Sequence, residues 1–524
     1  MAVGEVEYQQ LVAAVDGLAL TWADHDRALA EARRRGDGAT EVMLLLLAGM
    51  GSEGEGGAYA VALGLAAAAR RELVVRLAGW RDEGVAWHLL VALAEAYPED
   101  LPLLETALAS WSDSARQMPH AWWVEIGQSR WAPWHRLVRE LMVRGDEIGV
   151  LLRPGVEQSL GAIMALGVED VDPSRLVTLL GSPVWSGVTR LVLRGVDWTG
   201  PAGDVLAATA GFQGVGTLTL SGGLLPAPVL AELLVGASFP ALTLLEVAAP
   251  STPQPSDRRY PGQVVPAPVP LVEVARAVDT RPVARQRFEL ELCGLGVDAD
   301  GVRALAAAPV LAGLRGLAFT FSELTADDVA VLAAAEADLE RFTLHLGETG
   351  PAGAHALAGA RWRRRLRYLE LPNQGLGDAG TAELIRALDG GPLHTLILPH
   401  NKLGSLTVEA LGEVALPALH TLDLSYNRID DRDLARALAN PRLGQLRVVE
   451  LLGTGFGIHA ARALVGHTCL QTVNLGDTVG DQAAAVLGQA RWPELRRLQL
   501  RGVSDAAIAE LRPPGCLVTN ARFA

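Results

Sequence analysis

One phrase occurs three times between Leu366 and Ile429: LRYLELPNQGL (366–376), LHTLILPHNKL (393–403) and LHTLDLSYNRI (419–429). Each copy reads L-x-x-L-x-L-x-x-(N/Q)-x-L. Leu366 and Leu393 are 27 residues apart, and Leu393 and Leu419 are 26 residues apart. A fixed period in the range of roughly 20 to 50 residues indicates a solenoid of stacked units.

Each copy predicts a short strand that leads into a turn and then a helix. Alternation at Leu369 and Leu371 places both side chains on one face of a strand. Asn401 and Asn427 follow the strands, where their amides can satisfy backbone groups that the turn leaves unpaired. Asp378 and Asp430 or Asp431 open helix-like runs and are N-cap signals. Stacked strands lie about 4.8 Å apart and packed helices about 8 to 10 Å apart, so the sheet must line the inside of a curve.

The phrase resembles the leucine-rich repeats of the ribonuclease-inhibitor class, whose units pair a strand with a helix. The resemblance implies an α/β horseshoe with a parallel sheet on its concave face and helices on its convex face. We place about 12 to 13 repeats in residues 156–524, with a C-terminal cap over Ser504–Leu511 and the tail. Further copies open at Val188, Val215, Leu242, Arg287, Leu314, Leu339, Leu446, Leu470 and Leu495, and a degenerate copy at Gly161.

Residues 1–155 lack the phrase and form a separate, helical domain in this interpretation. Apolar residues recur with helical spacing, for example over Arg27–Arg35, Val85–Ala96 and Trp134–Val143. Eight of the 12 tryptophans lie here. They form a helical core, or else some of Trp122, Trp123, Trp131 and Trp134 are exposed anchors for a partner. The run Arg35-Gly36-Asp37 with Glu41 distantly resembles the helical companion domain found ahead of bacterial leucine-rich repeats, without its aromatic spacing or polar tail.

Composition narrows the classes of partner. The formal charge of −15 argues against nucleic acid and against anionic membrane surfaces as main partners. The N-terminus has no basic region typical of a signal peptide, and no apolar run is long enough to span a bilayer. Three scattered cysteines and a single lysine, Lys402, favour a reduced, cytoplasmic setting and a GC-rich bacterial genome.

A proline-rich insertion interrupts the array. Leu242 and Arg287 are 45 residues apart, and the excess contains seven prolines between Pro250 and Pro270. These prolines keep the insert extended. It is either a tolerated surface insertion or a binding loop with Arg258, Arg259 and Tyr260 at its tip.

The concave face is the candidate site for a protein partner. Residues between the inward leucines point outward, with acidic side chains in the middle of the arc and arginines at both ends. Complementary charge would suit a partner with a basic patch. The candidate binding residues are Arg190, Arg194, Glu246, Glu289, Glu291, Arg341, His345, Tyr368, Glu370, Asp423, Glu450, Arg497 and Arg501.

No catalytic, metal or cofactor site is expected from the motifs. Gly375, Gly377 and Gly380 match a dinucleotide phrase, but Gly377 is in register with Gly404 of the next repeat, so we interpret it as a repeat loop. His394 and His420 recur at one repeat position near Asp423, which is commoner on a sheet edge than in a metal site.

The sequence therefore predicts a non-enzymatic binding scaffold that acts as an inhibitor, sensor or recognition subunit. One alternative is an enzyme or effector in the N-terminal domain, with the repeats as its substrate-recognition module. Its candidate polar residues are His88, Glu95, His120, Glu125, His135 and Glu140. A second alternative is a homo-oligomeric structural protein.

Overall fold

The chain forms two compact units in the computed structural model. Unit 1 comprises Met1–Val168, Ser182–Val188 and Pro514–Leu517, and unit 2 comprises the remainder. The residues that the structure describes are 8–9, 11–12, 15, 22–48, 54–79, 83–128, 130, 132–153, 155–156, 160–182, 185–198, 200–208, 212–223, 225–235, 239–249, 267–268, 271–279, 288–345, 347–443, 445–476, 479–504, 506–507, 511 and 517–520.

Unit 1 is mainly helical, as the sequence predicted. Its helices are α2 (Trp22–Arg35), α3 (Gly38–Ala48), α4 (Gly54–Leu63), α5 (Ala67–Ala78), α6 (Glu83–Ala96), α7 (Leu101–Ala107), α8 (His120–Gly127) and α9 (Ile148–Leu151). Four short 3-10 helices join them: η1 (Pro98–Asp100), η2 (Leu108–Ser110), η3 (Asp113–Ala115) and η4 (Pro133–Leu137). Two strands follow, β1 (Glu140–Arg144) and β2 (Ala165–Glu169).

The helix expected over Trp134–Val143 is wrong. The chain forms η4 and then β1 there, with alternate burial along the strand. The apolar residues Leu137, Val138, Leu141 and Val143 are all buried. The spacing of these four apolar residues fits a helix as well as a strand over so short a run, so it could not decide between them.

Three of the five tryptophans of residues 1–155 whose side chains the structure describes belong to the core of unit 1. Trp87, Trp111 and Trp122 are buried, and Trp122 is 0% exposed. Trp122 is therefore not the exposed anchor that we considered. Trp123 and Trp134 are half-buried, and Trp131 lies outside the described residues.

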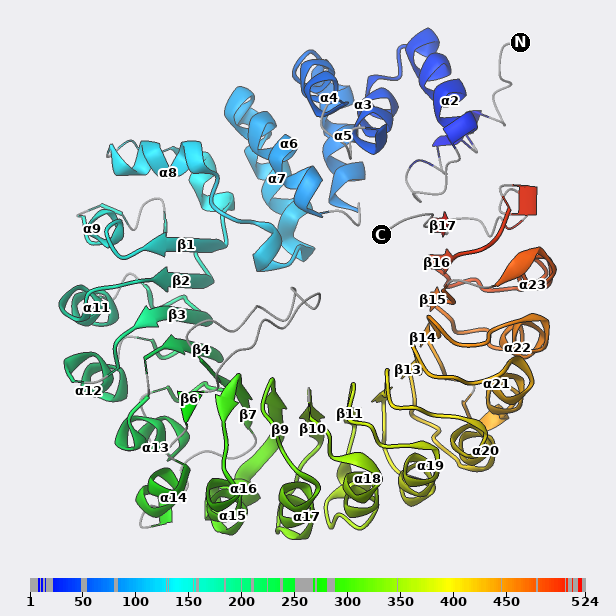
Figure 1. Ribbon diagram of the computed structural model, residues 1–524. Coiled ribbons are helices and arrows are strands. Elements are labelled where there is room, and N and C mark those ends of the chain that lie inside the picture. Colours follow the sequence, from blue (N-terminus) through cyan, green and yellow to red (C-terminus); the bar gives the residue numbers. More distant parts are fainter. Residues whose placement is uncertain are drawn as a thin grey trace. The chain divides into compact units, whose positions relative to one another are not determined.

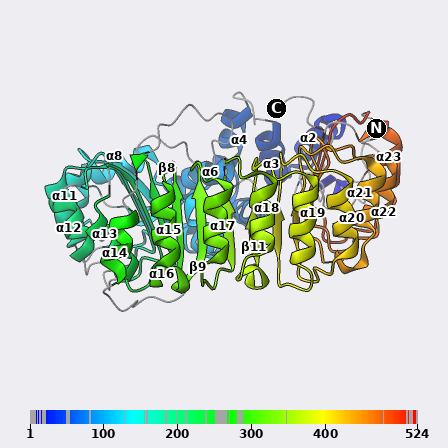
Figure 2. The same cartoon turned by 60° about the horizontal axis from the view of Figure 1, so that its bottom comes forward.

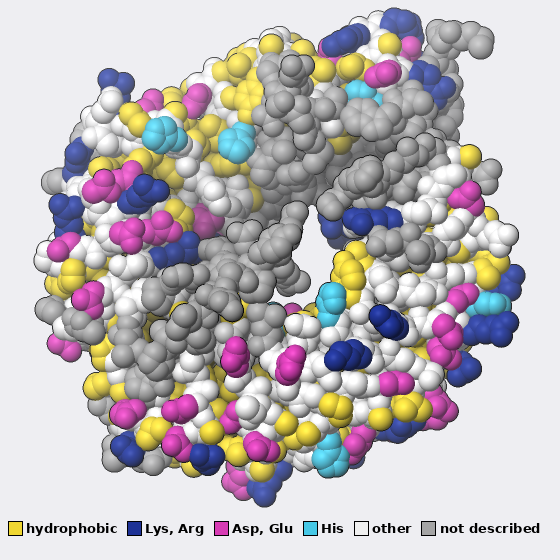
Figure 3. All heavy atoms as spheres, viewed as in Figure 1, with side chains coloured by type: hydrophobic (Ala, Val, Ile, Leu, Met, Phe, Trp, Pro, Cys, Tyr) yellow, Lys and Arg dark blue, Asp and Glu magenta, His cyan; other side chains and the backbone are white. Residues whose placement is uncertain are grey.

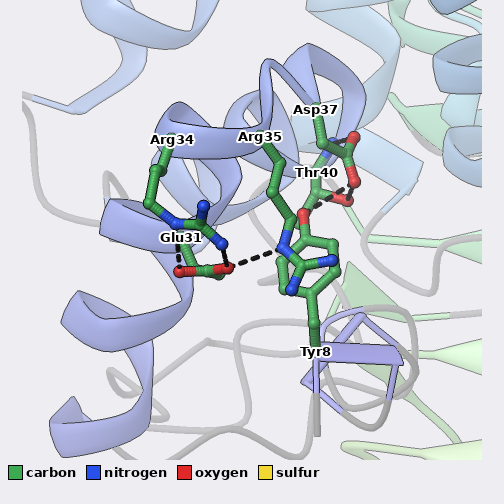
Figure 4. Close-up of polar contacts among 6 residues, drawn as sticks. All are labelled: Tyr8, Glu31, Arg34, Arg35, Asp37 and Thr40. Atoms are coloured by element: carbon green, nitrogen blue, oxygen red, sulfur yellow. Dashed lines mark hydrogen bonds and ion pairs between the residues drawn. The ribbon is translucent and has the colours of Figure 1, made fainter. Parts of the chain in front are cut away.

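The Arg35-Gly36-Asp37 run is part of a structural cluster (Figure 4). Asp37 accepts hydrogen bonds from the backbone N–H of Thr40 at 3.1 Å and from its hydroxyl at 2.8 Å, which caps α3. The Tyr8 hydroxyl donates to Asp37 at 2.7 Å, and the Arg35 guanidinium lies 4.3 Å from the Tyr8 ring centroid. Asp37 thus ties the residues around Tyr8 to the start of α3.

Unit 2 is a leucine-rich repeat solenoid with one parallel sheet. Its strands follow each other in chain order along the sheet, and Figure 1 shows them on the inner side of the arc with the helices outside. These strands are β3 (Arg190–Val196), β4 (Thr217–Gly222), β5 (Leu244–Ala248), β7 (Phe288–Cys293), β9 (Leu314–Thr320), β10 (Arg341–Leu344), β11 (Tyr368–Glu370), β12 (Thr395–Ile397), β13 (Thr421–Asp423), β14 (Val448–Glu450), β15 (Thr472–Asn474) and β16 (Arg497–Leu500).

The helices of unit 2 stand side by side along its outer face (Figure 2). They are α11 (Pro173–Leu180), α12 (Pro201–Ala208), α13 (Ala227–Val235), α14 (Leu271–Asp279), α15 (Ala299–Ala307), α16 (Pro309–Gly313), α17 (Ala326–Ala334), α18 (Gly350–Ala358), α19 (Asp378–Ala387), α20 (Ser405–Glu413), α21 (Asp431–Leu438), α22 (Ile458–Leu464) and α23 (Gly480–Leu487), with 3-10 turns η6 (Arg363–Arg365) and η7 (Pro441–Leu443). None of the described helices is long and apolar enough to cross a membrane.

The leucines of the phrase form the core between strands and helices. Leu369, Leu396 and Leu422 occupy one register position of neighbouring strands, and each is at most 1% exposed. Burying one such side chain contributes about 1.5 to 3 kcal/mol. A strand begins within two residues of each position at which a regular copy of the phrase opens, and β2 lies in the degenerate copy that opens at Gly161.

The repeat asparagines satisfy the turns, as predicted. Asn427 accepts from the backbone N–H groups of Asn401 at 2.8 Å and Leu403 at 3.1 Å. Its amide donates to the carbonyl oxygens of Leu398 and Leu424, both at 2.9 Å. Asn401 repeats the arrangement one repeat earlier, and Gln374 extends it. We call these three residues, Gln374, Asn401 and Asn427, the amide ladder; each is at most 1% exposed.

Asp378 does not cap its own helix. Its carboxylate accepts from the backbone N–H groups of Gly404 at 2.9 Å, Leu406 at 3.0 Å and Thr407 at 2.8 Å, which open α20 of the next repeat. Asp431 does the same for the start of α22. Asp430 caps α21 as predicted, through the N–H of Asp433. Capping between repeats therefore ties adjacent units together.

The insertion leaves the sheet continuous. β5 pairs directly with β7 in parallel register although the extra residues separate them in sequence. Ala267–Pro268 forms β6, which pairs with β8 (Leu295–Gly296). Arg258, Arg259 and Tyr260 lie outside the described residues, as does most of the expected last helix, Ser504–Leu511. The short strand β17 (Leu517–Asn520) follows.

Candidate functional site

Five carboxylates occupy a single register row on the inner face of the solenoid. The register pairs Glu246 with Glu291, and it continues through Ala318 and Thr343 to the next acidic position. From Glu370 the row passes Ile397 and then reaches Asp423 and Glu450. We call this set the acidic row: Glu246, Glu291, Glu370, Asp423 and Glu450.

Glu246 and Glu291 form the first adjacent pair. Strands in register lie about 4.8 Å apart, so the two carboxylates are close neighbours. Thr219 donates to Glu246 at 2.9 Å, and Thr320 donates to Glu291 at 3.2 Å. Burial and then the nearby Glu246 charge raise the pKa of Glu291 above its ordinary value, against the lowering effects of Thr320 and Arg341.

The centre of the row is a mixed cluster on β7, β10 and β11. Arg341 Nε lies 3.8 Å from Glu289 Oε2, and its guanidinium lies 4.2 Å from the Tyr368 ring centroid. Tyr368 donates its hydroxyl to Glu370 at 2.6 Å, and His345 Nε2 lies 3.0 Å from Glu370 Oε1. Glu370 is 6% exposed, so it holds Tyr368 and His345 in place rather than facing solvent.

A glycine makes the contact across β9 possible. Gly316 lies in register between Glu289 and Arg341. A Cβ at Gly316 would lie 2.7 Å from Cγ of Glu289, which is closer than real Cβ atoms approach. The absence of a side chain there leaves room for the acid and the arginine to meet over the strand.

Asp423 and Glu450 form the second adjacent pair. Burial raises the pKa of Glu450 to about 7, the Asn474 side chain opposes the rise, and the Asp423 charge adds to it. Asp423 accepts the backbone N–H of Ser425 at 2.8 Å. Among the described residues, no basic side chain lies within 4.0 Å of Glu246, Glu291 or Glu450 to form an ion pair.

The arginines lie toward the two ends of unit 2, as expected from their repeats. Arg190 and Arg194 are on β3 and half-buried, and Arg194 pairs with Glu169 at 3.1 Å. Arg497 is exposed on β16, and Arg501 directly follows that strand. The structure therefore brings Glu289, Arg341, His345, Tyr368 and Glu370 into one cluster, and leaves the four arginines apart from it.

The two histidines at the start of β12 and β13 stack on each other. The rings of His394 and His420 are 5.2 Å apart in an edge-to-face arrangement. Burial, Arg447 and His394 lower the pKa of His420. No three metal-ligating side chains lie close enough together to hold an ion in the part of the chain that the structure describes.

The polar residues of the enzyme alternative fall into two places in unit 1. His135 is fully buried beside Trp122, with Nε2 3.3 Å from Glu125 Oε2, and Trp122 donates to Glu95. Burial lowers the pKa of His135, against the effect of Glu125. His120 and Glu140 line a small pocket of about 200 Å³ together with Gln117, Met118, Trp123, Leu141, Met142 and Glu147. His88 is exposed on α6 and belongs to neither place.

Thr320 and Gly316 are members of the site that the sequence reasoning missed. Both lie on β9, whose apolar sequence LRGLAFT directed attention to the core. Aligning the repeats in register with Glu289 and Cys293 would have found them, because in-register residues share a sheet face.

Similarity to known proteins is partial. No protein-family model matches the chain. The chain is 31% identical over 182 residues to the Tonsoku-like protein of Bos taurus, and the match spans 30% of this chain and only 13% of that relative. Structural likeness links it to an internalin (inlF) from Listeria monocytogenes, at 16% identity and a TM-score of 0.33, over 71% of this chain and 83% of that one. The yeast Rad7 and Elc1 complex is similar at 11% identity and a TM-score of 0.37, over 91% of this chain and 95% of that chain.

Proposed function

We propose that this leucine-rich repeat protein is a non-enzymatic scaffold whose inner strand face binds a basic segment of a partner protein. The observation that carries the proposal is the acidic row. Glu246 and Glu291 lie side by side on adjacent strands of it, and among the described residues no basic side chain lies within ion-pair distance of these two or of Glu450. Burial and a neighbouring carboxylate disfavour the ionised forms of Glu291 and Glu450, which is costly to the isolated protein. A lysine or arginine side chain would relieve both effects.

The geometry suits an extended chain that crosses the strands. The pairs Glu246–Glu291 and Asp423–Glu450 flank the cluster around Glu370, so basic side chains of one segment can meet both pairs. Complementary charge along a row fixes the register of the bound segment as well as its affinity. This arrangement fits an inhibitor, sensor or recognition subunit, whose role is to hold another protein.

Binding should depend on pH in a defined direction. A cation beside Glu450 favours the ionised carboxylate, so binding releases the proton that Glu450 holds below about pH 7. Affinity for a basic partner therefore rises as the pH increases through about 7. Above that value Glu450 is already ionised, and its contribution to the affinity levels off.

The test uses neutral variants of the same shape. Glu246→Gln, Glu291→Gln and Glu450→Gln are combined in one chain, and binding of a fluorescent oligolysine peptide is measured together with capture of partners from native lysate. We expect at least about a tenfold loss of affinity, since each close charge pair contributes on the order of 1 kcal/mol or more.

A matched control carries Glu336→Gln, Glu383→Gln and Glu409→Gln, which alter three exposed carboxylates on or beside the outer helices. The control should bind oligolysine and capture partners as the unaltered chain does. If both variants lost the same amount of affinity, the loss would be due to net charge alone. That result would contradict a site on the inner face.

We also propose the ribonuclease-inhibitor-like class, a cytoplasmic location and a bacterial origin. Each regular repeat pairs a short strand with a helix of several turns, which supports the class. Cys469 is a free thiol, which supports a reducing compartment. The enzyme alternative predicts that His120→Ala or Glu140→Gln abolishes an activity of unit 1, and the oligomer alternative predicts a mass above 55.3 kDa in light scattering.

A further inference from the structure

A second charged surface lies where the chain leaves β12 and β13, at the carboxyl edge of the sheet. It consists of His400, Lys402, Tyr426 and Arg428, which we call the edge patch. All four residues are exposed, and Tyr426 retains 49% of its accessible surface. Figure 3 shows basic side chains and a histidine near the position that β13 has in Figure 1.

The aromatic rings of the edge patch are held rigidly. His400 and Tyr426 stack with their centroids 4.3 Å apart and their planes 9° apart. Gly453 of the following repeat also lies close to Tyr426, since a Cβ there would be 2.7 Å from Cδ1 of the ring. Tyr426 therefore contacts both the preceding and the following repeat, and it still keeps about half of its surface exposed.

The backbone beneath the patch is unusual for its residue types. His400, Lys402 and Tyr426 all have positive φ, at 55°, 58° and 57°, which side-chain-bearing residues rarely adopt. The N–H of His400 donates to the Ser425 carbonyl at 3.1 Å, and the N–H of Tyr426 donates to the Leu452 carbonyl. These bonds and the amide ladder hold the strained turns, so the four side chains project from a fixed frame.

The cations of the patch are available for a partner. Among the described residues, no carboxylate lies within 4.0 Å of Lys402 or Arg428. Asp430, two residues beyond Arg428, is engaged in capping α21. Lys402 and Arg428 therefore expose positive charge on adjacent repeats, close in sequence to Tyr426, on a chain whose formal charge is −15.

We infer that the edge patch binds an acidic peptide segment, with its carboxylates paired to Lys402 and Arg428 and hydrogen-bonded to the Tyr426 hydroxyl. Single-stranded nucleic acid is the less suitable occupant, because its bases need open aromatic faces and one face of Tyr426 is stacked on His400. The high negative charge of the whole chain also opposes a polyphosphate more than a short acidic peptide. The inference does not depend on the function proposed for the inner face.

The test measures binding of a fluorescent oligoglutamate peptide to the full chain at low salt by anisotropy. Lys402→Glu with Arg428→Glu is compared with a control that has the same charge change, Arg364→Glu with Arg462→Glu, on exposed arginines elsewhere in unit 2. We expect at least about a tenfold weaker affinity for the patch variant and less than about twofold for the control. Tyr426→Asn, which keeps a residue type that already adopts positive φ at Asn373, should weaken binding a few-fold.

The outcomes separate the alternatives. No binding by the unaltered chain, or equal losses in both double variants, would overturn the inference. Binding of labelled oligothymidylate in place of oligoglutamate would also overturn it, in favour of a nucleic-acid surface. Circular dichroism checks that each variant is folded, and Lys402→Gln with Arg428→Gln replaces the charge reversal if that variant unfolds. Oligolysine binding serves separately for the inner face, so failure of one surface leaves the other testable.

Discussion

The amide ladder and the acidic row are both rows of repeated polar residues in unit 2, but their environments are opposite. The ladder is completely buried, and Asn427 has backbone partners on both its oxygen and its nitrogen. The acidic row is half-buried for the most part, and burial raises the pKa of Glu291 and Glu450. The first row stabilises the turns, whereas the second keeps carboxylates in positions that disfavour their charge.

This difference teaches how a repeat separates stability from recognition. A buried polar group stabilises only when its hydrogen bonds are complete, because an unpaired group costs its full desolvation energy. Side chains that are left short of partners on an open face reduce stability, and they are worth retaining where a ligand completes them. Four substitutions test the contrast.

Asn427→Ala should have the largest effect. It removes the acceptor for two buried N–H groups and the donor for three carbonyl oxygens. We expect a loss of about 3 to 4 kcal/mol in the free energy of unfolding, measured with urea. The control Gln489→Ala changes an exposed amide and should cost less than about 0.5 kcal/mol. Similar values for the two would refute the role of the ladder.

Asp378→Ala should come second, at about 2 kcal/mol, because three N–H groups at the start of α20 lose one charged acceptor. Burial alone would raise the pKa of Asp378, but the hydrogen bonds from Thr407, Leu406 and Gly404 lower it. The stabilisation is therefore present above about pH 4 and is lost as the pH falls through the lowered pKa. The difference between the variant and the unaltered chain should shrink in acid.

The matched change for that experiment is Asp327→Ala, which removes an exposed carboxylate from the first turn of α17. It should cost less than about 1 kcal/mol, since a helix-dipole contact at the surface is worth only that much. A cost as large as that of Asp378→Ala would mean that capping between repeats adds nothing beyond ordinary helix charge.

Glu450→Gln should do the reverse and stabilise the chain at alkaline pH. The pKa of Glu450 is raised in the folded chain, so ionising this carboxyl destabilises the fold. The stability of the unaltered chain is therefore fully present below the ordinary pKa of 4.5 and is lost as the pH rises through about 7. With solvent screening discounted, we expect the variant to be more stable by about 1 to 2 kcal/mol at about pH 8.5 and nearly unchanged at about pH 5. Urea unfolding at both pH values measures this, with Glu409→Gln as the flat control.

Asp423→Asn should give the smallest effect. The Asp423 charge raises the pKa of Glu450, but burial is the larger cause of the raised pKa. The pH-dependent change in the free energy of unfolding should therefore decrease only slightly, on the order of 0.5 kcal/mol. A double-mutant cycle with Glu450→Gln measures the coupling between the two carboxylates. A coupling of zero would show that the two carboxylates do not sense each other, and that the row is a set of independent sites.

Much of the architecture could be read from individual residues of the sequence. The spacing of Leu366, Leu393 and Leu419 predicted parallel strands with helices outside, because strand alternation and a fixed period are local properties. Asn401 and Asn427 predicted satisfied turns for the same reason. The sequence also indicated which residues share the inner face, since side chains alternate between the two faces along each strand.

Only the tertiary structure decided which of these residues meet. Glu246 lies beside Glu291 although the insertion separates them in sequence, because β5 and β7 remain adjacent in the sheet. Asp378 serves the following helix, and Tyr426 lies between His400 and Gly453, because stacking brings one repeat's side chains over the next one's backbone. A repeat phrase fixes each unit, but contacts between units depend on register and on the side chain that each neighbour happens to carry.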